Sequence, residues 1–307
     1  MYTQSTDSLS QYIATQAKAL SYPDNNILAF PISRNTYSLE ANRYYFGHPE
    51  WSRNYLVACH QDGAFKKRWK TVIDNWQGQI VVDIGCGPGN IYRALHDHNG
   101  KPHLLIGVDV SLGGLQIAQE LGYTAVLADA HHLPFVDGFA DIVMLNAALH
   151  HCDDMAQVLR EAARLVKPGG LLVTDHDPQQ TAWKDSRFAR WIWNARLPLY
   201  RWIKRGGHTT IEEQHWSTAT EVHHQPGDGV TSDFFHQILE PLGFVVKCYP
   251  HNGGGAEVLR GNYGHPQLKM RLVQWLTGID SSLPEAALLL MCVARKQAIS
   301  KQDEVAT

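Results

Sequence analysis

Short apolar segments and amphipathic segments follow one another in a regular order along the chain. The apolar segments predict seven strands, at Ile80–Val82, His103–Val108, Ala125–Ala128, Asp141–Leu145, Gly170–Thr174, Phe244–Tyr249 and Ala286–Ala294. The clearest predicted helix begins after Asp153 and Asp154 and has a buried stripe of Met155, Leu159, Ala162 and Val166. Strands alternating with helices predict an α/β fold with a doubly wound, mainly parallel seven-stranded sheet. Ligands of such sheets bind where the strands end.

The aromatic residues suggest how the rest of the chain is organised. Residues 37–76 are rich in Tyr, Phe and Trp, and residues 178–230 contain five of the nine tryptophans but no clear strand. Ile13, Ala17 and Leu20 share one helical face, which predicts a short helix. The expected parts are a helical N-terminal cap (1–78), a ligand-binding core (79–177), an inserted substrate cap or lid (178–230), and the last helix and strands of the core with a tail (231–307).

Composition excludes several classes of protein. The net charge of −3 over 307 residues lacks the basic footprint that nucleic-acid binding needs. The five cysteines are scattered and form no Cys-x-x-Cys pair, which indicates a reducing compartment. The start of the chain is polar, with no basic residue before Lys18, and the longest apolar run is Ala286–Ala294. We therefore expect a soluble, cytoplasmic protein without a signal peptide or membrane span.

The turn after the first predicted strand carries the strongest chemical signal. Gly85, Gly87 and Gly89 alternate there, and Asp83 precedes them. Glycines permit positive φ angles and a close approach of a ligand to the backbone. Their spacing differs from the Gly-x-Gly-x-x-Gly that binds a pyrophosphate, and an acid before the turn suits a cationic amino-acid tail better.

Polar residues also end the next three strands. Asp109, followed by Val110, ends the second strand, where a carboxylate can accept hydrogen bonds from ribose hydroxyls. Asp129 and Ala130 follow the third strand and could hold an adenine. Asn146 ends the fourth strand. These residues would meet at one edge of the sheet.

In this order the motifs resemble those of class I S-adenosylmethionine-dependent methyltransferases, which have a Rossmann-like fold. The likeness is greatest to the small-molecule branch related to ubiquinone and menaquinone biosynthesis. It covers about a third of the chain and rests on Val81–Gly89, Gly107–Ser111, Ala128–Ala130, Leu133–Phe135, Phe139–Val143 and Leu165–Gly170.

The resemblance implies S-adenosylmethionine as the cofactor. The backbone of Gly85–Gly89 would lie against its methionine part, with Asp83 near the ammonium group, and Asn146 would lie at the methionine end. Asp109 would bind the ribose. Asp129 would accept from the adenine amine, with the Ala130 N–H on the ring.

Methyl transfer from a sulfonium needs an acceptor held in line and, for a hydroxyl acceptor, a base. His150, His151 and His176 follow the fourth and fifth strands and are the candidates, because histidine titrates near neutral pH. The pair could instead cap the following helix. No His-Glu-x-x-His or carboxylate–histidine spacing indicates a metal site, and we expect none.

The segment Trp183–Arg205 is amphipathic and basic, with seven Lys and Arg residues against a single acid, Asp185. Two interpretations remain open. The segment could be a lid whose apolar face covers the substrate, or it could contact an anionic membrane or a lipid-like substrate.

The favoured function is transfer of a methyl group to a small, apolar or aromatic acceptor, with O-methylation preferred because histidines gather at the strand ends. The alternatives are a non-catalytic S-adenosylmethionine-binding partner subunit and, less favoured, a nicotinamide-dependent dehydrogenase. A nucleic-acid methyltransferase is disfavoured because Asn146-Ala147-Ala148-Leu149 replaces the Asn/Asp-Pro-Pro-aromatic sequence that holds a flipped base. The acceptor, the methylated atom and the oligomeric state are not encoded in any recognisable motif.

Overall fold

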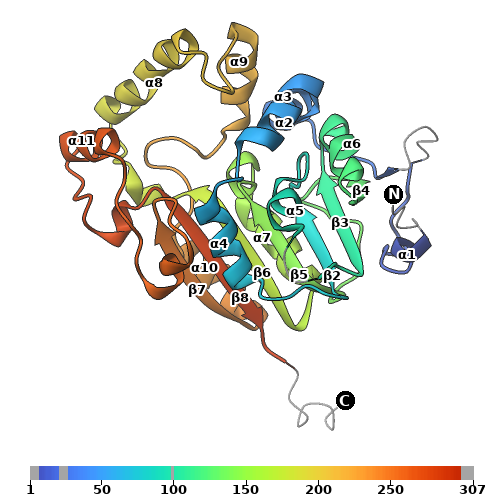
Figure 1. The fold of residues 1–307 in the computed structure, drawn as a ribbon. Helices are drawn as coiled ribbons and strands as arrows, with labels where there is room; N and C mark the ends of the chain where they lie inside the picture. Colours follow the sequence, from blue (N-terminus) through green and yellow to red (C-terminus); the bar gives the residue numbers. More distant parts are fainter. Residues whose placement is uncertain (1–6, 21–26, 98–99, 299–307) are drawn as a thin grey trace.

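A computed structural model describes residues 7–20, 27–97 and 100–298 of the chain. Its centre is an eight-stranded sheet in the order β1-β4-β3-β2-β5-β6-β8-β7 (Figure 1). The strands are β1 (Leu28–Ala29), β2 (Ile80–Ile84), β3 (Leu104–Asp109), β4 (Thr124–Leu127), β5 (Ala140–Asn146), β6 (Val166–Pro178), β7 (Phe244–His251) and β8 (Leu289–Lys296). The α/β fold with a mainly parallel sheet is therefore confirmed.

The predicted number of seven strands is wrong by one. The additional strand is β1, whose two residues pair in parallel with Val126 and Leu127 of β4. Two residues are too few to produce an alternating pattern. The helix predicted over Ile13–Leu20 is also wrong, because Ile13 and Leu20 form isolated bridges with Phe135 and Ala29. Sheet pairing at this edge thus replaces the helix that the local spacing favoured.

The sheet is parallel from β1 to β6, and β8 runs antiparallel between β6 and β7. The second strand in sequence, β2, lies between β3 and β5. The direction of the crossovers therefore reverses beside β2. A crevice for ligands forms at such a switch point, outside the carboxyl ends of the strands.

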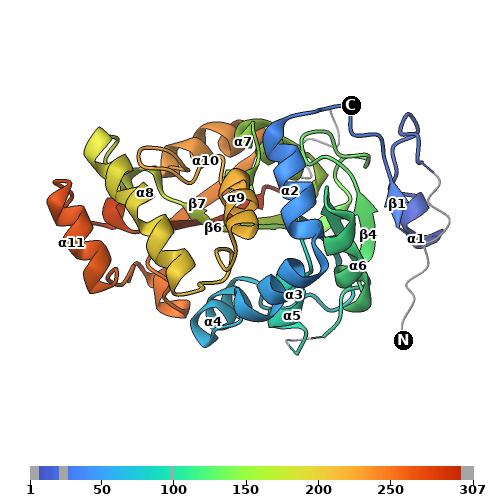
Figure 2. The same cartoon turned by 90° about the horizontal axis from the view of Figure 1, so that it is seen from above.

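Helices cover both faces of the sheet (Figure 2). One face packs against α7 (Met155–Leu165) and α10 (Ser232–Leu239), whose Leu159 and Phe235 are fully buried. The other face packs against α4 (Gly63–Val72), α5 (Asn90–Leu95) and α6 (Leu112–Glu120). Neighbouring strand residues point to opposite faces, as Val81 and Val82 do.

Two further helices precede α4 and lie over the carboxyl end of the sheet, namely α2 (Tyr37–Gly47) and α3 (Pro49–Ala58). Each of the three begins at a side-chain cap, provided by Thr36, His48 and Asp62 respectively. The first helix among the described residues is the short α1 (Asp7–Ser10). Apart from Trp76, which follows α4, the aromatic residues between 37 and 76 thus belong to α2, α3 and α4.

The segment after β6 contains α8 (Arg187–Trp202) and α9 (Ile211–Thr220), and α11 (Leu268–Leu276) comes between β7 and β8. Packing against α2 holds α9, because the Tyr37 hydroxyl lies 2.8 Å from His215 Nε2 and the Tyr44 hydroxyl donates to Glu212 at 2.7 Å. Short 3-10 helices complete the fold: η1 (Leu149–His151), η2 (Gln180–Ala182), η3 (Glu240–Leu242), η4 (Ala256–Arg260) and η5 (Pro284–Ala286). Within the described ranges, no helix combines the length and apolar character needed to cross a membrane.

Candidate functional site

A cavity opens at the carboxyl ends of β2, β3, β4 and β5 and encloses about 920 Å³, including the part open to solvent. Eight of the nine residues proposed to bind a cofactor line it: Asp83, Gly85, Gly87, Asp109, Val110, Asp129, Ala130 and Asn146. The helices α2 and α3 supply part of the opposite wall.

The glycine turn has the backbone shape that its sequence predicts. Gly85, Gly87 and Gly89 all have positive φ, at 68°, 49° and 93°. A Cβ at Gly85 would lie 2.8 Å from the Cβ of Ala148, so a side chain there would collide with the segment after β5. Gly89 is not a lining residue; a Cβ there would meet Leu121 and Tyr123 at 2.9 Å. Gly89 therefore allows close packing behind the turn.

Asp109 holds the turn in place. Its carboxylate accepts from the Gly87 N–H and from the Ser111 N–H, both at 2.8 Å. Burial raises the pKa of Asp109 to about 6, against the effect of these hydrogen bonds. A ligand that offers hydroxyl donors here would compensate the buried charge.

Asp83 is 1% exposed, and its carboxylate accepts from the Tyr123 hydroxyl at 2.7 Å. Burial raises the pKa of Asp83 to about 7, and the charge of Asp109 adds to this effect. A cation that entered the cavity would pair with this carboxylate. No pattern in the sequence indicated Tyr123, which lies directly before β4 and contacts this carboxylate.

Asp129 is fixed by a histidine that sequence reasoning left outside the site. Its Oδ1 accepts from the His131 N–H at 3.0 Å and lies 2.6 Å from His131 Nδ1. His131 Nε2 accepts from the Asp154 N–H at 3.2 Å, so the proton of the neutral ring is on Nδ1. Burial opposes ionisation, but the bonds with His131 lower the pKa of Asp129. Arg34 approaches its other oxygen at 3.9 Å.

Asn146 provides a test of whether the cavity fits a charged ligand. Its Oδ1 is buried and has no hydrogen-bond partner among the described residues. An unpaired buried acceptor is costly unless a ligand supplies the donor. With Asp83 also in the wall, the cavity fits an adenosyl amino acid, which carries an ammonium group and hydroxyl donors.

The side of the cavity away from these acids is more apolar. Phe46 of α2, Tyr55 of α3 and His60 line it. His60 has a positive φ of 60°, and its Nε2 lies 3.0 Å from the Tyr55 hydroxyl. Burial lowers the pKa of His60 to about 3, so the ring is neutral. A non-glycine residue held at positive φ is typical of sites under functional constraint. The sequence prediction did not include these three residues.

The three candidate histidines lie in different places. Among them, His151 alone lines the cavity. His150 is buried beside it, with ring centres 4.0 Å apart, and its Nδ1 lies 2.9 Å from Asp177. His176 lies outside the lining, packed against His60 and Phe65.

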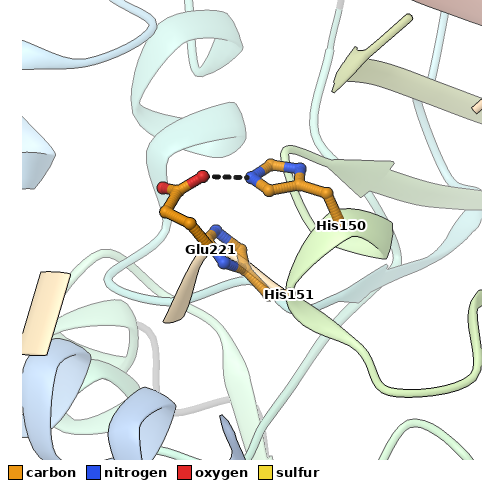
Figure 3. A group of neighbouring side chains, drawn as sticks. All are labelled: His150, His151 and Glu221. Carbon is orange, nitrogen blue, oxygen red and sulfur yellow. Dashed lines mark ion pairs between the residues drawn. The ribbon is translucent and has the colours of Figure 1, made fainter. Parts of the chain in front are cut away.

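Both histidines of η1 are oriented by partners on Nδ1. His151 Nδ1 donates to the Thr220 carbonyl at 2.7 Å, and the Asp177 carboxylate accepts from His150 Nδ1. Each ring therefore has its Nε2 turned away from these partners. Glu221, just after α9, approaches His150 Nε2 at 3.5 Å (Figure 3). Neither Asp177 nor Glu221 was among the predicted site residues.

A buried ion pair fastens α4 to the end of β6. Asp175 accepts from Arg68 Nε and Nη2 at 3.1 and 2.9 Å and from the Trp69 indole at 2.8 Å. Its other oxygen lies 2.8 Å from His251 Nε2. The side chains of Arg68, Asp175 and His251 are fully buried. Burial alone would raise the pKa of Asp175. The neighbouring His176, His251 and Arg68 outweigh this effect and hold that pKa well below its usual range.

Comparison with known proteins agrees with this geometry. A family described as "Methyltransferase domain" matches residues 82–174. A demethylmenaquinone methyltransferase of Lactiplantibacillus plantarum is 32% identical over 161 residues, which are 50% of this chain and 68% of that protein. Another, from Corynebacterium kroppenstedtii, is 35% identical over 111 residues, 36% of this chain and 47% of that protein.

The chain spans about half the length of most of the curated relatives it matches. Among solved structures, the crystal structure of the [4+2]-cyclase SpnF superposes with a TM-score of 0.51 at 17% identity, covering 88% of this chain and 98% of that one. At this identity the similarity shows a shared fold.

Proposed function

Because this chain belongs to the class I S-adenosylmethionine-dependent methyltransferase family, we propose that it transfers a methyl group from S-adenosylmethionine to a small acceptor. The observation that carries the proposal is the cavity itself. Asp83, Asp109, Asp129 and Asn146 end four neighbouring strands and all face one space beside a glycine turn. Such a set of acceptors matches a ligand that has an ammonium group, two ribose hydroxyls and an adenine amine.

When bound, the cofactor supplies an activated methyl group on a sulfonium, and the chain has to orient the two reactants. In our proposal Asp83 and Asn146 receive the amino-acid end, and Asp109 receives the ribose. Asp129 accepts from the adenine amine, and the Ala130 N–H donates to the ring. The hydrogen bonds from Gly87 and Ser111 orient the Asp109 carboxylate before any ligand arrives.

We propose an apolar or aromatic acceptor bound between α2, α3 and η1. Phe46, Tyr55 and His60 form this wall, and its aromatic rings suit a flat or hydrocarbon-rich molecule. The demethylmenaquinone methyltransferases among the relatives, by their name, act on a quinone. The hydroxyl-bearing quinol form of a quinone-like ring, or an isoprenoid-bearing phenol, is therefore the first acceptor to test.

O-methylation is the form of the reaction that the wall supports best. The bond of His151 Nδ1 to the Thr220 carbonyl leaves the lone pair on Nε2, which can receive a hydroxyl proton. His151 lines the cavity, whereas His150 and His176 do not. We therefore assign the role of proton acceptor to His151. The other two histidines, His150 and His176, lie behind the cavity wall.

The fold alone does not establish methyl transfer, since the [4+2]-cyclase has it too. A non-catalytic partner subunit that binds S-adenosylmethionine is the second candidate. Incubation with methyl-labelled S-adenosylmethionine and a panel of phenols, quinols and amines separates the two. We expect S-adenosylhomocysteine and a labelled phenol ether. Tight cofactor binding without release of S-adenosylhomocysteine on the whole panel would favour the partner subunit, and a labelled carbon or nitrogen would refute O-methylation.

We also propose that α8 and α11 lie on an anionic membrane surface. Trp191 and Trp202 of α8 are 66% and 80% exposed, and Leu268 and Trp275 of α11 are 79% and 72% exposed. The two helices lie side by side in both views (Figures 1 and 2). Among the described residues that line the cavity, none belongs to α8, and the exposed tryptophans of α8 favour the membrane interpretation over the lid.

Exposed tryptophans flanked by basic side chains are typical of interfacial helices. Arg187, Arg201 and Lys204 are exposed around α8, as are Lys269 and Arg271 on α11. Co-sedimentation with phosphatidylglycerol vesicles at low salt should capture the protein, and replacing Trp191 and Trp202 with Ser should abolish it. Ile211→Ser, an equally exposed position on α9, is the control. Absence of binding at low salt would refute the proposal.

A further inference from the structure

Three potential metal ligands converge from two distant segments of the chain at the edge of the cavity. One ring nitrogen from each of His150 and His151 and one carboxylate oxygen of Glu221 all lie within 4.8 Å of one another. Figure 3 shows the three side chains gathered at one place, with Glu221 directed at the His150 ring. We infer that His150, His151 and Glu221 form a binding site for a divalent transition-metal ion.

The distances are close to those of an occupied site. Two ligands about 2.1 Å from one tetrahedral ion lie about 3.4 Å apart. His150 Nε2 and Glu221 Oε2 are separated by 3.5 Å, which matches this spacing. The third ligand lies within 4.8 Å of both, so an adjustment of at most about 1.4 Å would complete the set.

Each of the three ligands has an outer partner that holds it. The Asp177 carboxylate accepts from His150 Nδ1 at 2.9 Å, and the Thr220 carbonyl accepts from His151 Nδ1 at 2.7 Å. His224 Nδ1 lies 2.6 Å from Glu221 Oε2. Metal-binding histidines almost always donate their second N–H to a carboxylate or carbonyl. Three polar side chains brought together by chance would not need such outer partners, so their presence favours a metal site.

The charges also favour a dication. Asp177 and Glu221 bring two negative charges to this place, and Asp177 is fully buried, with its Oδ2 unpaired among the described residues. Buried charge needs compensation by a cation close at hand. An ion ligated by His150 would lie one imidazole away from Asp177, and this carboxylate–histidine–metal chain would balance both acids.

The two nitrogen ligands and one oxygen ligand select the class of ion. Mg²⁺ and Ca²⁺ prefer oxygen ligands alone, whereas imidazole suits Zn²⁺ and its neighbours in the first transition row. Two histidines and one glutamate are a known set for zinc sites that keep a position open for water or substrate. We therefore expect Zn²⁺ to bind and Mg²⁺ not to bind.

The ion would add a link between two segments that are distant in sequence and already meet where the His223 N–H donates to the His150 carbonyl at 2.9 Å. Glu221 follows α9 in the inserted segment, whereas His150 and His151 follow β5 in the core. Because His151 lines the cavity, the open coordination position of the ion would lie near the proposed acceptor. The inference that the ion activates an acceptor hydroxyl rests on the proposed function. The inference that the ion binds here does not. His151 would then act as a ligand rather than as the proton acceptor.

Calorimetric titration of the full chain with Zn²⁺ after dialysis against a chelator tests the inference. We expect one ion per chain and a higher thermal midpoint with Zn²⁺. Glu221→Gln should lower the affinity at least about 100-fold, and His224→Gln, which removes only an outer partner, about 10-fold. His236→Gln is the matched control, because His236 also pairs with a glutamate but lies on α10. It should bind Zn²⁺ as the unmodified chain does.

Equal Zn²⁺ affinity in Glu221→Gln and the unmodified chain would overturn the inference, as would the lack of one-to-one binding. His151→Gln examined with Co²⁺, whose visible absorption reports its ligands, gives a second measurement if Glu221→Gln is unstable. An unchanged Co²⁺ spectrum would also count against the site. Binding of S-adenosylhomocysteine is measured in the same samples. Zn²⁺ binding without cofactor binding would refute the proposed function and leave the metal site standing.

Discussion

The two walls of the cavity differ in how the chain builds them. The donor wall, where we propose that the methyl donor binds, comes from consecutive strand ends between Asp83 and Asn146. Nearby backbone N–H groups hold its polar side chains, as those of Gly87 and Ser111 hold Asp109. The acceptor wall is assembled from α2, α3, His60 and η1, and η1 is far from the other three in sequence. This difference explains why the donor is readable from motifs whereas the acceptor is not. It also predicts that the two walls respond differently to substitution.

The largest effect is expected at the buried ion pair that fastens α4 to the end of β6. Asp175→Asn removes the charge that compensates buried Arg68, and should lower the free energy of unfolding by about 3–5 kcal/mol. Urea denaturation followed by tryptophan fluorescence measures this. Glu120→Gln, in the exposed pair with Arg53, is the control and should leave the unfolding midpoint unchanged. A similar loss in both variants would mean that the buried pair has no special part in stability.

On the donor wall, Asp109→Ala should weaken binding of S-adenosylhomocysteine by about 1–3 kcal/mol, since a charged hydrogen-bond partner is lost. Calorimetric titration measures the affinity. Asp97→Ala, an exposed carboxylate after α5, should have no effect on binding. Unchanged affinity in Asp109→Ala would show that the ribose is bound elsewhere.

Protonation of Asp83 offers a finer test of the same wall. Its pKa of about 7 is raised by burial and by Asp109, so the carboxyl group is largely protonated at pH 6 and ionised at pH 8. An ammonium ligand pairs with the ionised form, and affinity should therefore fall roughly tenfold from pH 8 to pH 6. Tyr123 donates to this carboxylate and lowers its pKa, so Tyr123→Phe should shift the curve to higher pH. Tyr92→Phe, at the neighbouring ring, should leave the curve in place.

The smallest effect on the donor is expected from the acceptor wall. Phe46→Leu keeps an apolar side chain and should change the affinity for S-adenosylhomocysteine by less than about twofold, while raising KM for an aromatic acceptor. Binding and steady-state assays with the same preparation compare the two values. A loss of donor affinity equal to that of Asp109→Ala would show that the two walls are not separate.

The fold was predictable because its signals are local. The central strands β2 to β5 are buried, mainly apolar runs, and Asp154 caps α7 by accepting from the Gln157 N–H. The two residues of β1 give no such signal, since their position depends on pairing with β4. Likewise the spacing of Ile13, Ala17 and Leu20 favoured a helix that sheet contacts prevent. Long-range pairing outweighs weak local preference at this edge.

The site was predictable for the same reason on one side only. Asp83, Asp109 and Asp129 follow strands directly, whereas Tyr123, His60 and Glu221 reach the cavity region through tertiary packing. The expectation of no metal site came from the absence of short metal-ligand motifs in the sequence. Such motifs cannot reveal a glutamate that follows α9 and lies beside His150 only in the folded chain. Contacts between segments that are distant in sequence determine where Tyr123, His60 and Glu221 lie.

The most direct test of the central claim is calorimetric titration of the unmodified chain with S-adenosylhomocysteine and, separately, with a nicotinamide dinucleotide. The account predicts one molecule of S-adenosylhomocysteine per chain, competition with S-adenosylmethionine, and no heat from the dinucleotide. Binding of the dinucleotide in place of S-adenosylhomocysteine, or no binding of either, would contradict it.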